Sequence, residues 1–208
     1  MLVESTTENK ILMYQAREKL MGNWGLAVGA AVVYFVISFG LQYIPIVGSI
    51  ISLLISGAMS IGLASLALSI SRDRETDLSE IFIGFQKFGT GLGAFLLIMI
   101  FIFLWSLLFI IPGIIAALSY SMTFFIIAET DSIGSMEALN ISKEIMRGNK
   151  WKLFCLYFRF VGWLLLCTLT FGIGFIFLSP YIYVSHAQFY NDLKETDRDL
   201  FVRPQISE

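Results

Sequence analysis

Residues 92–129 read LGAFLLIMIFIFLWSLLFIIPGIIAALSYSMTFFIIAE and carry no charge before the terminal glutamate. A helix that spans a membrane needs about 20 predominantly apolar residues, so this stretch is long enough for two. Pro112-Gly113 marks the turn that would join them. Outward from this hairpin, residues 20–71 and 160–191 are also free of charged side chains. These three runs predict an all-α integral membrane protein built from helical hairpins.

The composition excludes an ordinary soluble protein. Hydrophobic residues make up 57% of the 208 positions and charged residues only 14%, against roughly 25% in soluble domains. The formal net charge is −2, so the charge balance gives no indication of a nucleic-acid partner. We expect the lipid bilayer to be the main partner of a single membrane domain, 1–208, that ends in a short polar tail at 195–208.

The last hydrophobic run, 160–191, allows two interpretations. As one long helix it would give five spans and an external C-terminus. Gly172, Gly174 and Pro180 interrupt the run, however, and the positive charges of the tail would then lie on the wrong side of the membrane. Two helices fit better and give six spans. Because only about 18 Å of helix fits between residue 160 and the first glycine, the fifth helix must begin near Trp151.

Six helices in three hairpins bring every charged cluster to one face of the membrane. The clusters are 1–19, 72–87, 129–159 and 192–208. Lys and Arg concentrate on the cytoplasmic side of membrane proteins, so both termini are predicted to be cytoplasmic in a multi-pass protein of the cell membrane. The fourth and sixth helices, at about 16 residues each, are short enough to be re-entrant instead of spanning.

Amphipathic stretches in the charged clusters precede the hairpins. In TDLSEIFIGFQKF (76–88), Asp77 and Glu80 have the spacing of a capping box, and helical spacing places four apolar residues on one face: Leu78, Ile81, Phe82 and Phe85. In SMEALNISKEIMRGNK (135–150) the polar stripe comprises Glu137, Asn140, Glu144 and Arg147. We therefore expect a cytoplasmic interfacial helix before each hairpin.

A Gly-Asn pair followed closely by Trp recurs at the entrance to two hairpins. Gly22-Asn23 precedes the first hairpin and Gly148-Asn149 the third, and Phe85-Gln86, halfway between them, lies at the same junction of the second. This spacing, with the same order of elements each time, predicts a threefold repeat. The predicted repeats are 10–71, 72–130 and 131–194.

Arg159 is the most informative single residue, because an ionisable group inside a span is costly and marks a candidate site. Its nearest acidic partners by topology are Glu129 and Asp131. Two interpretations remain open. Arg159 either extends to the lipid phosphates or forms a structural ion pair, or it belongs to a site for a substrate or lipid headgroup.

His186 is the only histidine, and helical spacing aligns it with Ser179, Tyr183 and Tyr190 on one stripe of the sixth helix. Such a stripe could form a proton relay or an anion site. Hydrogen bonding between helices is the alternative. The candidate polar site of this sequence therefore comprises Arg159, His186, Tyr183, Glu129 and Asp131. One histidine cannot build a metal site, and we expect no cofactor.

Small residues recur along the second helix at Ser52, Ser56, Ser60 and Ala64, with Gly57 and Gly62 between them. This pattern predicts close helix packing, and the same holds for Gly25 and Gly29 of the first helix. Cys155 and Cys167 are separated by about 18 Å if they share one helix, so they are predicted not to form a disulfide.

The segments GNKWKLF, FVGW, LTFGIGF, PY and FYNDL of the last 61 residues, with PGIIAALSYSMTFFI upstream, give a resemblance over most of residues 10–194. The chain resembles a family of bacterial integral membrane proteins that is classified only as a domain of unknown function. More distantly, its layout looks like the membrane domain attached to some glycerophosphodiester phosphodiesterases, without their catalytic domain. The resemblance implies a bacterial plasma membrane and supplies no catalytic residues.

Three functional classes follow. The first is a non-enzymatic binding or accessory role, with a lipid, a peptide or a membrane protein as partner. The second is a transporter of small molecules or lipids that uses Arg159 and His186 as an intramembrane site. An intramembrane enzyme is disfavoured, because the sequence holds neither a GxSxG motif nor paired carboxylates within a span.

Overall fold

The computed structural model describes residues 5–44, 46–170 and 172–196, which form helices and no strand. From position 197 onward, the predicted tail lies outside the described residues. In chain order the helices are α1 (Asn9–Leu20), α2 (Trp24–Gln42), α3 (Val47–Ser71), the 3₁₀ helix η1 (Leu78–Lys87), α4 (Phe88–Leu108), α5 (Ile110–Tyr120), α6 (Thr123–Glu129), α7 (Ser135–Ile145), α8 (Lys150–Leu169) and α9 (Ile173–Thr196).

Among the described residues, five segments are long and apolar enough to cross a membrane. They are Trp24–Gln42, Val47–Ser71, Leu78–Leu108, Ile110–Glu129 and Lys150–Leu169. The last hydrophobic run forms two helices rather than one, and α8 begins at Lys150, as predicted. α9 has 24 residues but contains Pro180, His186 and Gln188. These polar or helix-interrupting residues make it less apolar than the other five, and the sixth span stays a prediction.

The second hairpin turns at Phe109 rather than at Pro112-Gly113. Phe109 is extended, with φ −160° and ψ 153°, between α4 and α5. Pro112 lies in the first turn of α5, where proline is tolerated because the first amides of a helix have no intrahelical partner. The predicted turn was therefore three residues late, since proline is compatible with a helix start as well as with a turn.

The fourth predicted helix consists of two shorter helices, α5 and α6, with a break between them. Ser142 of α7 bridges this break: its hydroxyl accepts a hydrogen bond from the Met122 amide (3.2 Å) and donates one to the Ser119 carbonyl (2.9 Å). A buried side chain thus satisfies the backbone groups that the break leaves without helical partners. Together, α5 and α6 cover 20 residues, which is the length of one span.

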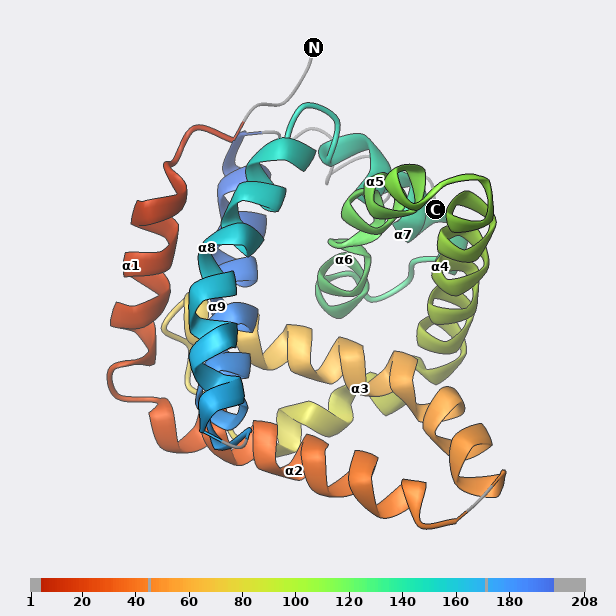
Figure 1. Ribbon diagram of the computed structural model, residues 1–208, viewed down its shortest axis with the longest axis horizontal. Helices are drawn as coiled ribbons and strands as arrows, with labels where there is room; N and C mark the ends of the chain where they lie inside the picture. Colours follow the sequence, from red (N-terminus) through yellow and green to blue (C-terminus); the bar gives the residue numbers. More distant parts are fainter. Residues whose placement is uncertain (1–4, 45, 171, 197–208) are drawn as a thin grey trace.

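The helices that precede the second and third hairpins pack on the hairpin before them in the chain. η1 lies against α3, and α7 lies against α4, α5 and α6. α1 has no hairpin before it in the chain and packs along α9 of the last hairpin, as the left side of Figure 1 shows. This contact closes the three hairpins into a ring. The hairpins do not share one direction, because α2 and α3 run across the view while α8 and α9 run along its height (Figure 1).

The two Gly-Asn junctions have the same local structure. Gly22 and Gly148 adopt positive φ angles of 148° and 87°, which glycine accepts without steric cost. The side-chain amide of Asn23 donates to the Lys19 carbonyl (3.3 Å), and the side-chain amide of Asn149 donates to the Ile145 carbonyl (3.1 Å). The first and third hairpins are therefore entered through equivalent turns, whereas η1 passes directly into α4.

The interfacial stretch at 76–88 differs from its prediction. It is a 3₁₀ helix, in which Ile81 and Gly84, one turn apart, are buried against α3. The Asp77 side chain makes no capping hydrogen bond, and Glu80 accepts a hydrogen bond from Ser69 (3.1 Å) instead. The predicted capping box is therefore wrong. Three of the four apolar residues, Leu78, Phe82 and Phe85, are more than a third exposed, so η1 does not bury all of them against the protein.

Glycines allow α3 to approach its neighbours closely, as predicted. A Cβ atom at Gly57 would lie 2.2 Å from the Gly91 carbonyl oxygen of α4. At Gly62 it would lie 1.8 Å from the Ile81 carbonyl oxygen of η1. Gly25 is different, because a Cβ there would meet no described atom within 4 Å. Close packing therefore explains the glycines of α3 but not Gly25 of α2.

The buried core lies where the bases of the three hairpins meet. It is formed mainly by residues 57–71 of α3, by α6 and α7, and by residues 184–193 of α9. Toward the turns the side chains are apolar yet exposed, with Leu107 at 74% and Leu169 at 78%. Exposed apolar surface of this extent requires a lipid environment, so the chain is a membrane protein. Cys155 and Cys167 are both free, as predicted.

Candidate functional site

A cavity of about 390 Å³ lies where α3, α5, α6, α8 and α9 meet. We call it the central cavity. Its walls are mostly aromatic and apolar, with a few hydroxyl groups and one imidazole. The lining contains no Asp, Glu, Lys or Arg. The lining comprises Ser60, Ala64, Ala117, Ser121, Phe124, Phe125, Tyr157, Ile182, Tyr183 and His186.

Among the described residues that line the central cavity, His186 is the one with a buried side-chain atom that makes no hydrogen bond. Its side chain is buried, and Nδ1 lies 3.5 Å from the Tyr157 hydroxyl. Nε2 has no hydrogen-bond partner among the described residues. The Ser60 and Ser121 hydroxyls, by contrast, each donate to a carbonyl of their own helix at 2.8 Å. A buried polar atom without a partner costs free energy, which a bound group could recover.

A cluster of charged and polar side chains joins the C-terminal ends of α3, α6 and α9. We call it the polar junction. Glu129 of α6 forms ion pairs with Arg72 (2.6 Å) and Lys194 (2.7 Å) and accepts a hydrogen bond from the Tyr190 hydroxyl (2.9 Å). Arg72 also donates to Asn191 at 2.8 and 3.0 Å. One carboxylate thus connects the second helices of all three hairpins.

The central cavity and the polar junction share an aromatic contact. Phe125 lines the cavity, and its ring stacks on Tyr190 with the ring centroids 5.7 Å apart. Tyr190 in turn donates to Glu129. Tyr190 therefore contacts both the polar junction, through Glu129, and the wall of the central cavity, through Phe125.

The predicted site residues fall into three groups. His186 and Tyr183 both line the central cavity, and Glu129 forms the centre of the polar junction. Asp131 is fully exposed and pairs with Lys87 at 3.4 Å. Arg159 is exposed on α8 and forms no ion pair with any described residue, so neither Glu129 nor Asp131 is its partner. Among the described residues, no three His, Cys, Asp or Glu side chains come together as a metal site would require.

Comparison with protein families identifies one match, described as "Protein of unknown function (DUF975)", over residues 1–119 and 107–197. This chain belongs to the DUF975 family. No curated protein and no solved structure matches the DUF975 chain. The resemblance to an uncharacterised family is thereby confirmed, and the more distant likeness to the membrane domain of glycerophosphodiester phosphodiesterases finds no support in these comparisons.

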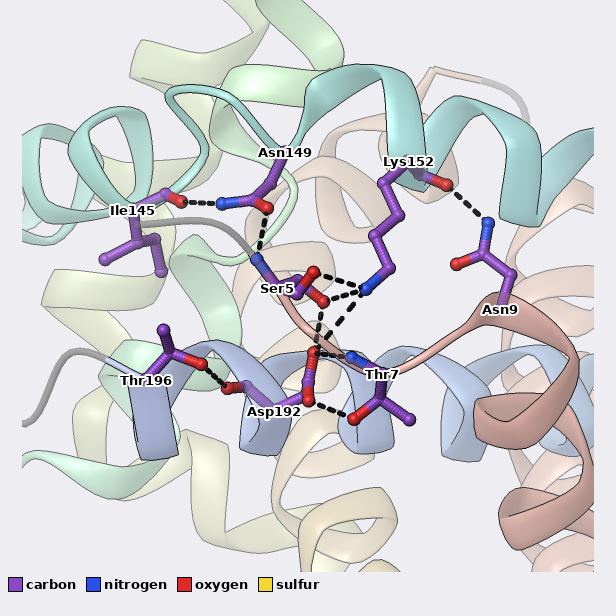
Figure 2. Close-up of polar contacts among 8 residues, drawn as sticks. All are labelled: Ser5, Thr7, Asn9, Ile145, Asn149, Lys152, Asp192 and Thr196. Carbon is purple, nitrogen blue, oxygen red and sulfur yellow. Dashed lines mark hydrogen bonds and ion pairs between the residues drawn. The ribbon is translucent and has the colours of Figure 1, made fainter. Parts of the chain in front are cut away.

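The DUF975 chain also fastens its N-terminal segment to the last hairpin (Figure 2). Asp192 of α9 accepts hydrogen bonds from the Ser5 and Thr7 hydroxyls and pairs with Lys152 of α8 at 3.7 Å. The Ser5 amide donates to Asn149 (2.8 Å), and Lys152 donates to the Ser5 carbonyl (2.9 Å). We call these five residues the clasp, because they hold the segment before α1 against α8 and α9 and so secure the ring.

We expect Asp192→Ala to release the N-terminal segment without unfolding the protein. The side chain of Asp192 is only 9% exposed and serves three partners, so its removal should cost about 1–2 kcal/mol locally. The cost stays modest because Lys152 regains water once the segment detaches. Hydrogen exchange at residues 5–9 should accelerate about 5- to 30-fold at this cost.

Asp131→Ala is the matched control for this measurement. Asp131 is also paired with a lysine but is fully exposed, so its loss should leave stability and the exchange rates of residues 5–9 nearly unchanged. Equal exchange rates in wild-type and Asp192→Ala protein would show that the clasp does not hold the segment.

Several residues of the site carry no signal of their own in the sequence. Tyr157 lies on a helix rich in aromatic residues, and Arg72 and Asn191 lie at helix ends, where charged and polar residues are common. One signal could have found the junction. Arg72, Glu129 and Asn191 each lie near the C-terminal end of the second helix of a predicted hairpin, where the charged clusters were expected to meet on one face.

Proposed function

We propose that this chain is a non-enzymatic, multi-pass protein of the bacterial plasma membrane that binds an uncharged amphiphile in its central cavity. In this proposal the chain crosses the membrane six times and both termini are cytoplasmic. The observation that carries the proposal is His186, which lines a cavity of about 390 Å³ and whose buried Nε2 atom has no hydrogen-bond partner among the described residues.

The chemistry of the cavity supports this ligand class. Its aromatic and apolar walls favour an apolar body, and the absence of acidic and of permanently charged basic side chains from its lining disfavours an ion. His186 and Tyr183 both line the cavity, and each carries a group that can form hydrogen bonds. A ligand with a single hydroxyl or carbonyl group would satisfy Nε2 and bury its remainder among the rings of Phe124 and Phe125.

A binding role is favoured over catalysis because the hydroxyls of Ser60 and Ser121 already donate to their own helices. No carboxylate lines the cavity beside His186 to orient it as a general base. Transport of the same ligand is the alternative function. The contact from Phe125 through Tyr190 to Glu129 favours it, since opening the polar junction would move the cavity wall.

The proposal is tested by native mass spectrometry of protein released gently from its own membranes. His186→Phe removes the hydrogen-bonding nitrogen while keeping an aromatic ring, and Ala117→Phe fills the cavity from an exposed position on α5. Wild-type protein should carry a discrete bound small molecule, and each variant should retain about tenfold less, as expected for the loss of one well-made contact.

Arg159→Ala serves as the control, because Arg159 is exposed outside the cavity. It should retain the ligand at the wild-type level. Cooperative thermal unfolding of all variants establishes that they are folded. Wild-type protein without a bound molecule, or a molecule that both cavity variants retain, would contradict the proposal, and loss from Arg159→Ala alone would favour the arginine site instead.

A further inference from the structure

A second recess, separate from the central cavity, is formed by α1, α2, α8 and α9. We call it the Arg17 groove. Its volume is about 430 Å³, and it shares no lining residue with the central cavity. The residues that carry the argument are Arg17, Trp24, Trp163, Leu166, Phe177 and Tyr181.

Arg17 is the only charged residue that lines this groove. Its side chain is exposed, and it forms no ion pair with any described residue. The neighbouring cation Lys19 does have a partner, Asp73. The guanidinium group of Arg17 therefore retains its full capacity to bind an anion, and its planar fork of donors matches a phosphate.

The remainder of the groove is apolar and continues onto open surface. Trp163, Leu166 and Phe177 line it and are each more than half exposed. These side chains belong to α8 and α9, whose outer faces require a lipid covering. Trp24 lies on the wall beside them, and tryptophan favours the boundary between headgroups and acyl chains.

We propose that the Arg17 groove binds one anionic phospholipid, with the phosphate at the Arg17 guanidinium and an acyl chain along Trp163, Leu166 and Phe177. The charge of the groove is complementary to that of the headgroup, because the lining holds one cation and no acid. The apolar end is open, which suits a long acyl chain that continues into the bilayer better than a small enclosed molecule.

The test measures tryptophan quenching by brominated phospholipids in nanodiscs of phosphatidylcholine. Trp105→Phe and Trp151→Phe, introduced together, leave the emission of the two groove residues Trp24 and Trp163. Brominated phosphatidylglycerol should reach half-maximal quenching at about fivefold lower mole fraction than brominated phosphatidylcholine, as expected for one arginine at an anionic headgroup.

Arg17→Gln should abolish this difference between the two lipids, and Arg17→Lys should retain much of it, since it keeps the charge. Arg159→Gln is the matched control, because Arg159 is another exposed arginine that forms no ion pair with a described residue. It should behave as wild type. Equal quenching by both lipids in wild-type protein, or a preference that survives Arg17→Gln, would overturn the proposal. Absence of quenching by either lipid would also overturn it and would indicate that a second protein chain covers the groove.

Discussion

Gly62→Ala is expected to lower the free energy of unfolding by about 3 kcal/mol, the largest effect among these single substitutions. The added Cβ would lie 1.8 Å from the Ile81 carbonyl oxygen and 2.5 Å from its carbon. Both atoms belong to the backbone of η1, so no side-chain rotation can relieve the contact, and η1 must move away from α3. The apparent melting temperature in detergent should fall by about 6–12 °C.

Gly25→Ala provides the matched control for Gly62→Ala. Both glycines lie in predicted membrane spans, but a Cβ at Gly25 would meet no described atom within 4 Å. Alanine favours the helix over glycine by roughly 0.5–1 kcal/mol, so this variant should be as stable as wild type or slightly more stable. Equal melting temperatures of the two variants would contradict the close packing of η1 on α3.

Glu129→Ala is expected to lower the free energy of unfolding by about 2–3 kcal/mol. Glu129 is only 21% exposed and connects Arg72, Lys194 and Tyr190. Its loss leaves partly buried cations without their shared carboxylate, which costs more than the loss of an exposed pair. Glu129→Gln should cost less, because its amide oxygen can still accept the hydrogen bond from Tyr190.

A double-mutant cycle separates the ion pair from general damage at the junction. Arg72→Gln with Glu129→Gln removes both charges, so the double variant should be more stable than the sum of the single effects by about 1–2 kcal/mol. Glu144→Ala on α7 is the control, since Glu144 is exposed and pairs with no described cation. Strict additivity would show that Arg72 and Glu129 are not coupled.

The turns and starts of the helices were predictable where local sequence and the length of a membrane span determine them. Gly148-Asn149 precedes α8, whose start at Lys150 follows from the length that a span requires. The position of Pro112 misled the placement of the second turn, because proline is equally compatible with the first turn of a helix. The 3₁₀ geometry of η1 was not predictable, since it depends on the fit of Ile81 and Gly84 against α3.

The candidate site was predictable only in part. His186 and Tyr183 were aligned by helical spacing, and they do line one cavity. Arg159 was predicted as a site residue because it is a charged residue in an apolar segment, but it is exposed on α8. Arg72 was not predicted as a site residue, because it lies at a helix end, where charged residues are common. Its part in the polar junction depends on its ion pair with Glu129.

The sequence by itself determined that this is an all-helical membrane protein of paired apolar segments, and that α3 packs closely through its glycines. These properties follow from local hydropathy and residue size, which need no knowledge of distant contacts. Only the tertiary structure decided that α1 closes the ring on α9, that Glu129 joins three helices, and that His186 lines a cavity. Such contacts depend on how each helix is rotated and which neighbours it meets, and packing between segments far apart in the chain sets both.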